Sequence, residues 1–203
     1  MAFDADPRWL GDAAWPAHAW PIDASPGAEP PYSLHAPPVC PAAFKDALAQ
    51  LASGVAIVSC WDGSAPRGLL VSSITGLSVD PPRFLFCLRK QASSHDALLR
   101  ARCCGVAVLA EDDEAEALRF STPGLSQERF EPGRWDLTPD AAPAYQGGLS
   151  TTACVIDHRI ETGTHTVFIV SAIAVRSTPG RPLIVHARTF QRLGLAASSP
   201  KGL

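Results

Sequence analysis

Hydroxyl-bearing side chains gather at the end of one predicted strand, where they could bind the edge of a planar polar ring. They are Ser72, Ser73, Thr75 and Ser78. Such a ring needs hydroxyl groups and backbone donors along its edge, and a strand end can offer both. A strand end that is simply rich in turn-forming residues is the plainer alternative.

Cations and further hydroxyls lie just before a second predicted element, a short helix over residues 95–100. They are Arg89, Lys90, Ser93 and Ser94. The unpaired amide groups and the dipole at a helix N-terminus favour an anion, so this segment could hold a phosphate group. From the residues alone an ordinary helix cap is the simpler interpretation, because Ser94 is a natural N-cap.

Other patterns with catalytic residue types are weaker. The run Ser94-His95-Asp96 contains the residue types of a catalytic triad, but adjacent residues cannot point into one hydrogen-bonded relay. Neither His158 with Glu161 nor the two other strand histidines have the spacing of a known metal site, so no metal is predicted. The sequence also lacks G-x-G-x-x-G, which argues against nicotinamide binding on a Rossmann unit.

The elements that would position these groups are mostly strands. Apolar residues recur at helical spacing at Phe44, Leu48 and Leu51, which predicts a helix over residues 41–52 that ends before Gly54. Runs of apolar and β-branched residues predict strands, and the turn signal Asp62-Gly63 joins the first two into a hairpin. The predicted strands cover residues 55–60, 68–72, 83–88, 105–109, 150–161, 165–176 and 182–186, and the remaining helices 95–100 and 112–120. This order favours a mainly β fold, an antiparallel closed sheet with short helices at its rim.

The first 40 residues differ in composition from the rest of the chain. Prolines occur there at positions 7, 16, 21, 26, 30, 31, 37 and 38. Proline at this density interrupts helices and strand ladders, so we expect a Pro-rich N-terminal extension over residues 1–40. Because it carries Trp9, Trp15, Trp20 and Tyr32, we favour an arm lying on the domain or on a partner subunit over a disordered leader. The folded domain is expected over residues 41–195, followed by a tail over 196–203.

Charge and composition exclude several classes of function. A formal net charge of -3 without a Lys/Arg cluster gives no attraction for nucleic acid or anionic lipid. No apolar stretch approaches membrane-spanning length and no secretory signal is recognisable, so we expect a cytoplasmic protein. The six cysteines show no C-x-x-C spacing and most lie in apolar runs, which favours buried free thiols over disulfides or a metal site.

Six motifs, in order along the chain, carry a resemblance to a known family. They are Phe44…Leu51-Ala52-Ser53-Gly54-Val55-Ala56-Ile57-Val58, Gly68-x-x-Val71-Ser72-Ser73, Leu77-Ser78-x-Asp80-Pro81-Pro82, Ser93-Ser94-His95-Asp96-Ala97-Leu98, Val108-Leu109-Ala110-Glu111-Asp112 and Gly163-x-His165-Thr166-x-Phe168. Each motif alone is weak. Together, from about Phe44 to about Phe190, the chain resembles the flavin reductase-like family, small NAD(P)H-dependent flavin reductases that often supply reduced flavin to a separate monooxygenase.

The resemblance implies a split β-barrel, usually a homodimer, that holds FMN or FAD near the dimer interface. The residues that it implies along the flavin ring are Leu70, Val71, Ser72 and Ser73. Those on the phosphate side are Leu88, Arg89, Lys90, Ser93 and Ser94. His165 would stand near the nicotinamide of NADH or NADPH and is the candidate catalytic residue.

Six positions depart from what the family commonly has there. They are Leu70, Gly76, Ala107, Asp113, Thr164 and Val185, where threonine, serine, asparagine, glutamine, aspartate and tyrosine are frequent. If three of these were lost flavin hydrogen bonds at about 1 kcal/mol each, flavin affinity would fall roughly a hundredfold. Flavin could then still serve as a diffusing substrate, although not as a tightly held group.

These observations predict an NAD(P)H:flavin oxidoreductase that supplies reduced flavin to a partner monooxygenase. The alternative is a non-catalytic split barrel that binds flavin, haem or another planar ligand. The departures at Leu70, Ala107 and Val185 favour this alternative.

Overall fold

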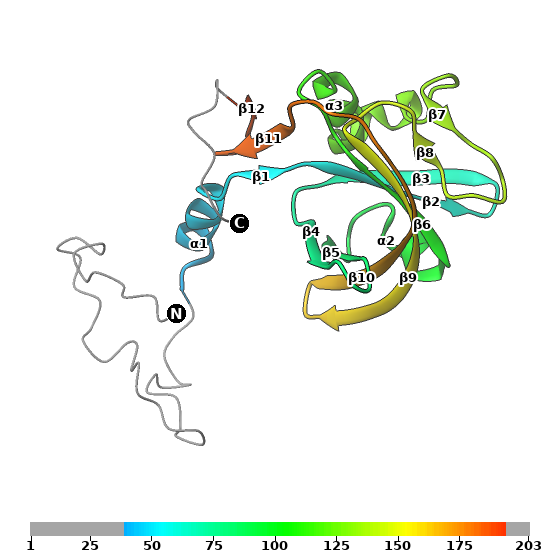
Figure 1. Ribbon diagram of the computed structural model, residues 1–203. Helices are drawn as coiled ribbons and strands as arrows, with labels where there is room; N and C mark the ends of the chain where they lie inside the picture. Colours follow the sequence, from blue (N-terminus) through cyan, green and yellow to red (C-terminus); the bar gives the residue numbers. More distant parts are fainter. Residues whose placement is uncertain (1–38, 194–203) are drawn as a thin grey trace. The chain divides into compact units, whose positions relative to one another are not determined.

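The computed structural model describes residues 39–193. The predicted extension over residues 1–40, except its last two residues, and the predicted tail over 196–203 lie outside the described residues. One compact unit begins at Asp46, and Figure 1 shows that it consists mainly of strands.

The principal sheet has seven strands, and all of its neighbouring pairs are antiparallel. They are β2 (Ala56–Asp62), β3 (Ala65–Val71), β4 (Thr75–Ser78), β5 (Arg83–Arg89), β6 (Cys103–Val108), β9 (Ser150–Thr162) and β10 (His165–Ser177). The spatial order is β3-β2-β6-β9-β10-β5-β4. The predicted mainly β, antiparallel class is therefore confirmed. The split barrel was expected to be closed or partly open, and the hydrogen-bonded order, which ends at β3 and β4, corresponds to the open form.

Two tight turns set the register of the longest pairings. In the β2–β3 hairpin Asp62 pairs with Ala65, and Gly63 adopts a positive φ of 61° in the turn. In the β9–β10 hairpin Thr162 pairs with His165, and Gly163 has a φ of 41°. Positive φ favours glycine, so the sequence encodes both turns locally.

Smaller elements surround this sheet, and the sequence did not predict most of them. They are the short strands β1 (Ser53–Gly54), β7 (Trp135–Asp136), β8 (Ala144–Tyr145) and β12 (Thr189–Arg192), and the 3₁₀ helix η2 (Pro123–Glu128). Strand β11 (Leu183–His186) was predicted, and it pairs with both β1 and β12 in a three-stranded sheet. Strand β4 of the principal sheet was also missed. The missed strands have two to four residues, which is often too short for an alternating pattern to be recognised in a sequence.

Three α-helices complete the fold: α1 (Pro41–Ala49), α2 (His95–Arg100) and α3 (Glu114–Ser121). Helix α1 ends earlier than its predicted boundary at residue 52. No helix among residues 39–193 is long and apolar enough to cross a membrane.

Strand β2 divides the interior into two apolar clusters. Ala56, Val58 and Cys60 face one cluster, which also contains Phe86 and Phe168 with stacked rings 5.2 Å apart. Ile57, between Ala56 and Val58, faces the second cluster, which is rich in aromatic side chains. Because both faces of β2 are covered, its first five residues are all buried and the strand begins with the apolar run Ala56-Ile57-Val58 rather than an alternating pattern. All six cysteines are free thiols, and Cys60, Cys104 and Cys154 are buried, whereas Cys40 and Cys103 are exposed.

Candidate ligand-binding cleft

An open cleft of about 1360 Å³ lies where the C-terminal ends of β3 and β5 approach α3 and the β11–β12 hairpin. This volume exceeds the roughly 300–1,000 Å³ of common small-molecule sites. Apolar side chains from several elements form its walls: Val55, Leu69, Leu70, Leu88, Leu118, Phe120, Val185 and Phe190. A flat, largely apolar ligand with a few polar groups suits such a surface.

Most of the residues predicted to bind a ligand do meet in this cleft. Leu70, Val71, Ser72, Ser73, Leu88, Arg89, Ser93 and His165 all line it. They come from three segments that are distant in the sequence, so the fold brings them together. Lys90 and Ser94 are the two predicted residues that do not line the cleft.

The cleft serines differ in whether their hydroxyl groups are available to a ligand. Ser73 donates to the carbonyl oxygen of Cys87 at 2.8 Å and accepts from the amide of the same residue at 3.1 Å. Its hydroxyl therefore fastens the end of β3 to β5. Ser72 and Ser93 are exposed, and neither hydroxyl has a hydrogen-bond partner within residues 39–193. Among the predicted serines, these two therefore have a hydroxyl available to a ligand, and Ser126 of η2 is a further exposed serine in the cleft lining.

Ser94 and Lys90 have protein partners outside the cleft lining. Ser94 occupies the N-cap position of α2, but its hydroxyl makes no capping bond there. It is buried and donates to the carbonyl oxygen of Gly68 at 3.0 Å. Lys90 forms an ion pair with Glu161 on β9 at 2.8 Å. Each side chain thus has a protein partner, and neither residue lines the cleft.

His165 and Arg89 stand side by side at one rim of the cleft. They are directly opposite in the β10–β5 register, so their side chains leave the same face of the sheet. The hydroxyl of Thr164 lies 2.9 Å from Nδ1 of His165. The other ring nitrogen, Nε2, remains for a ligand.

Arg129, which directly follows η2, lines the cleft and was missed by the sequence analysis. Its guanidinium donates to three carbonyl oxygens, those of Arg119 (2.7 Å), Gly68 (3.3 Å) and Thr122 (3.2 Å). It also lies over the ring of Phe120, 5.4 Å from the centroid. Burial lowers the pKa of Arg129 from its ordinary value. No spacing pattern links Arg129 to Gly68, since 61 residues separate them.

The cleft is positive although the chain as a whole is negative. Its lining contains Arg89, Arg129 and Arg188 but only one carboxylate, Glu114, whereas the formal net charge of the chain is -3. Arg188 forms an ion pair with Asp46. A cleft with apolar walls and an excess of cations is suited to an anionic ligand with a large ring.

The model of the flavin reductase-like domain family matches residues 48–194 of this chain. The chain belongs to the flavin reductase-like family. The match includes every residue that we have placed in the cleft. It also confirms the family that the six sequence motifs indicated.

Named relatives and a solved structure of similar fold agree with this assignment. An FMN reductase (NADH) from Methylorubrum extorquens is 33% identical over 155 residues, covering 76% of this chain and 90% of that protein. The reductase component of a 4-nitrophenol monooxygenase from Rhodococcus opacus is 29% identical, over 75% of this chain and 81% of that protein. An NADH:FAD oxidoreductase of Streptomyces globisporus, solved with NAD and FAD fragments, is 29% identical with a TM-score of 0.69, over 76% of this chain and 93% of that chain.

The structure separates the six departures from the family pattern by location. Only Leu70 and Val185 line the cleft. Ala107 is buried in the aromatic-rich cluster, and Asp113 accepts hydrogen bonds from the Ala110 amide and the Tyr145 hydroxyl. The other two, Gly76 and Thr164, lie on β4 and in the β9–β10 turn. Only Leu70 and Val185 could therefore remove direct contacts with a ligand. The expected loss of flavin affinity is accordingly smaller than the sequence alone predicted.

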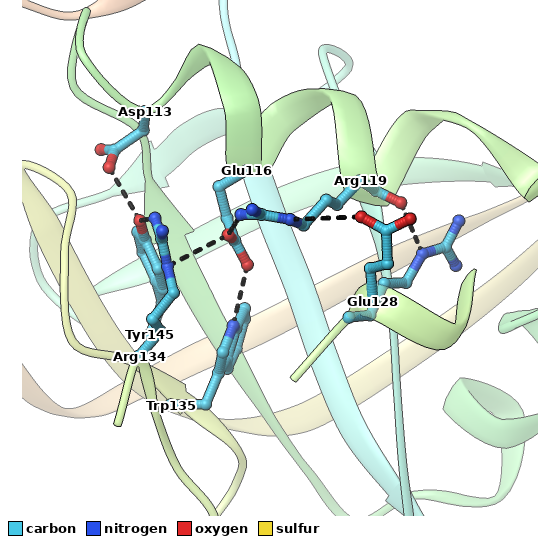
Figure 2. A network of polar contacts seen from close by, with 8 residues as sticks. Asp113, Glu116, Arg119, Glu128, Arg134, Trp135 and Tyr145 are labelled. Atoms are coloured by element: carbon cyan, nitrogen blue, oxygen red, sulfur yellow. Dashed lines mark hydrogen bonds and ion pairs between the residues drawn. The ribbon is translucent and has the colours of Figure 1, made fainter. Parts of the chain in front are cut away.

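A buried carboxylate of this flavin reductase-like domain holds one wall of the cleft in place. Figure 2 shows Glu116 of α3 at the centre of a polar network. Its carboxylate, only 1% exposed, lies 2.7 Å from Arg119 and 3.4 Å from Arg134. It also accepts a hydrogen bond of 3.0 Å from the Trp135 indole. The network joins α3, which supplies Leu118 and Phe120 to the cleft, to the loop that follows Arg129.

Tyr145 extends the network towards the N-terminus of α3. Its hydroxyl accepts from Arg134 at 3.1 Å and donates to Asp113 at 2.8 Å. Burial raises the pKa of Tyr145 to about 12, with the Asp113 hydrogen bond acting in the same direction. The phenol thus stays protonated at neutral pH, and its proton maintains the link between Arg134 and Asp113.

Proposed function

We propose that this chain is a cytoplasmic NAD(P)H-dependent flavin reductase that uses FMN or FAD. The observation that carries the proposal is the cleft, in which large apolar walls, available hydroxyls and unneutralised arginines meet. We further propose that residues 41–195 form the flavin-binding domain, with residues 1–40 as an extension and 196–203 as a tail. The named relatives support the activity, because several are called FMN reductase (NADH).

The side chains that line the cleft are chemically suited to binding a flavin. Leu70, Val71 and Leu88 offer an apolar surface for the isoalloxazine ring, and the available Ser72 hydroxyl lies beside them. Ser73 would shape this surface through its bonds to Cys87. Arg89 and Ser93 offer a charge and a hydroxyl to a phosphate group. A bound flavin would supply the capacity to accept a hydride from a reduced nicotinamide.

His165 would position the nicotinamide for this reaction. Its ring stands at the rim beside Arg89, with one nitrogen held by Thr164. A ring fixed in this way can hydrogen-bond an incoming carboxamide without a large loss of conformational freedom. The apolar walls would exclude water from the stacked rings, and stacking geometry is the protein's main contribution to hydride transfer.

We propose two partners for this protein, a monooxygenase that receives reduced flavin and a second copy of the chain. The first is supported by the Rhodococcus opacus relative, which is named as a reductase component. The second is supported by Ile173 and Val175, which are two residues apart on β10 and are 63% and 70% exposed. Neighbouring exposed apolar side chains can belong to a protein interface.

Blocking the cleft tests the proposed function. NADH and NADPH oxidation is measured with added FMN or FAD for the parent, for Leu70→Trp, which fills the cleft, and for Leu77→Trp on β4, outside the cleft. We expect catalysis by the parent and by Leu77→Trp, and a large loss in Leu70→Trp. A parent that binds flavin but oxidises neither nicotinamide would instead support the non-catalytic alternative, which the apolar Leu70 and Val185 favour.

A further inference from the structure

In the part of the chain that the structure describes, the cleft contains two arginines without a carboxylate partner, the predicted Arg89 and the half-buried Arg129. Among residues 39–193, eight arginines form ion pairs with carboxylates, but Arg129 is not one of them. All three acceptors of its guanidinium are neutral carbonyl oxygens. A half-buried charge is normally paired, because desolvation without a counter-charge is unfavourable.

The three carbonyl oxygens fix the orientation of this guanidinium. They come from β3, from α3 and from Thr122 after α3, so the fork is held from three directions. An arginine has five N–H donors, and the three bonds leave two of them for a ligand. Because the side chain is already ordered, binding an anion would require little further loss of rotamer freedom.

Arg129 is adjacent to the segment that carries Ser93. The carbonyl oxygen of Gly68 accepts from both the Ser94 hydroxyl (3.0 Å) and Arg129 (3.3 Å). Ser93, the neighbour of Ser94, has an available hydroxyl and lines the same cleft as Arg129. The segment that carries Ser93 and the side chain of Arg129 are therefore fastened to the same carbonyl oxygen, through Ser94 and through the guanidinium.

We propose that Arg129 is a phosphate-binding residue, and that with Ser93 it recognises the phosphate group of a nucleotide in the cleft. Arginine is suited to this because its planar fork can donate two parallel hydrogen bonds to phosphate oxygens. The bound phosphate would supply the counter-charge that Arg129 lacks. The inference rests on the proposed function in that the nucleotide is a flavin or a nicotinamide nucleotide.

The test compares ligands that differ only in phosphate, with binding followed by flavin fluorescence and no nicotinamide present. In Arg129→Gln we expect the Kd of FMN to rise about 10- to 100-fold. The Kd of riboflavin, which lacks the phosphate, should change less than about twofold. Arg67→Gln removes the same charge from an exposed residue that pairs with Asp62 outside the cleft, and it should leave both values unchanged.

A second variant covers the case in which Arg129→Gln does not fold. Arg129→Lys keeps the charge but not the planar fork, so FMN should weaken less than in the glutamine variant, with riboflavin again unaffected. If the phosphate belongs to the nicotinamide nucleotide, NADH should bind more weakly while reduced nicotinamide riboside does not. That result would show that Arg129 binds a phosphate group of the nicotinamide nucleotide rather than that of the flavin.

Two results would overturn the proposal. One is an equal loss of FMN and riboflavin, which would make Arg129 a brace between strands and helix. The other is unchanged binding of all four ligands by a folded variant. Failure of the proposed function gives a different pattern, a parent that shows the FMN–riboflavin difference but oxidises no NADH.

Discussion

The hydroxyl of Ser94 and the guanidinium of Arg129 share one acceptor, the carbonyl oxygen of Gly68. Through this atom the start of α2, strand β3 and the segment after α3 are joined beneath the cleft. Side-chain space is also limiting here, because a Cβ on Gly68 would lie 3.0 Å from both the Phe120 and the Phe130 rings. This lack of space for a side chain explains why a glycine occupies the middle of strand β3.

Replacing Gly68 by alanine should therefore destabilise the domain. The added methyl group would lie 2.9 Å from the carbonyl oxygen of Val58 as well as against the two rings, and overpacking of this kind lowers the free energy of unfolding by about 1–3 kcal/mol. Gly76→Ala is the matched control, since a Cβ added to Gly76 would have no atom within 4 Å. Urea unfolding measures both, and equal midpoints would contradict the close packing at Gly68.

Replacing Ser94 should affect the stability of the domain, whereas replacing Ser93 should affect the binding of FMN. Ser94→Ala removes a buried hydrogen bond, so we expect it to lower the free energy of unfolding by about 0.5–1.5 kcal/mol and to leave the ratio of FMN to riboflavin affinity unchanged. Ser93→Ala should lower FMN affinity with little effect on unfolding. Fluorescence titration and thermal unfolding of the two variants measure these effects. Weaker FMN binding in Ser94→Ala but not in Ser93→Ala would show that the phosphate lies elsewhere.

His165→Ala should slow reduction of bound flavin while flavin affinity stays nearly unchanged. Loss of one positioning hydrogen bond corresponds to about 1–3 kcal/mol, or roughly 5- to 150-fold in kcat/KM for the nicotinamide. His158 of β9 lies outside the cleft lining, so His158→Ala is the control. Stopped-flow reduction at several NADH concentrations measures the effect. Parent-like rates combined with lower thermal stability would make His165 a turn residue only.

Glu116→Gln should weaken the α3 wall of the cleft. The substitution keeps an acceptor for Trp135 but removes the negative charge between Arg119 and Arg134, and we expect the free energy of unfolding to fall by about 1–3 kcal/mol. Glu128 is 59% exposed and 4.0 Å from Arg119, so Glu128→Gln should change stability by less than about 0.5 kcal/mol. Equal effects of the two variants in urea unfolding would show that Glu116 is not the centre of the network.

The long elements of the fold could be predicted because their residue types and turn residues favour the same structure that they adopt in the folded domain. Strands β9 and β10 combine β-branched residues with a glycine turn, and α2 was predicted with its observed bounds, His95–Arg100. Strand β12 and helix η2 were missed because short or proline-rich segments are defined by tertiary contacts rather than by periodicity. The apolar spacing that predicted the first helix does not reflect burial, because Leu48 and Leu51 are 49% and 64% exposed.

The site was partly predictable for a similar reason. Motifs identified β3, β5 and the β10 rim, where residue types and chain order carry information. Arg129 and the β11–β12 hairpin enter the cleft only through folding, and neither has a spacing pattern that marks it. Composition also could not show that the hydroxyls of Ser73 and Ser94 bind backbone carbonyls, because serines with and without protein partners look alike in a sequence.

The most direct test of the proposed activity is anaerobic mixing of the full chain with oxidised FMN and excess NADH, followed by the loss of oxidised-flavin absorbance. We predict that the chain bleaches the flavin far faster than the same mixture without protein, and that Leu70→Trp abolishes most of the acceleration. Bleaching at the uncatalysed rate by folded protein, with FMN and FAD and with NADH and NADPH, would contradict the account.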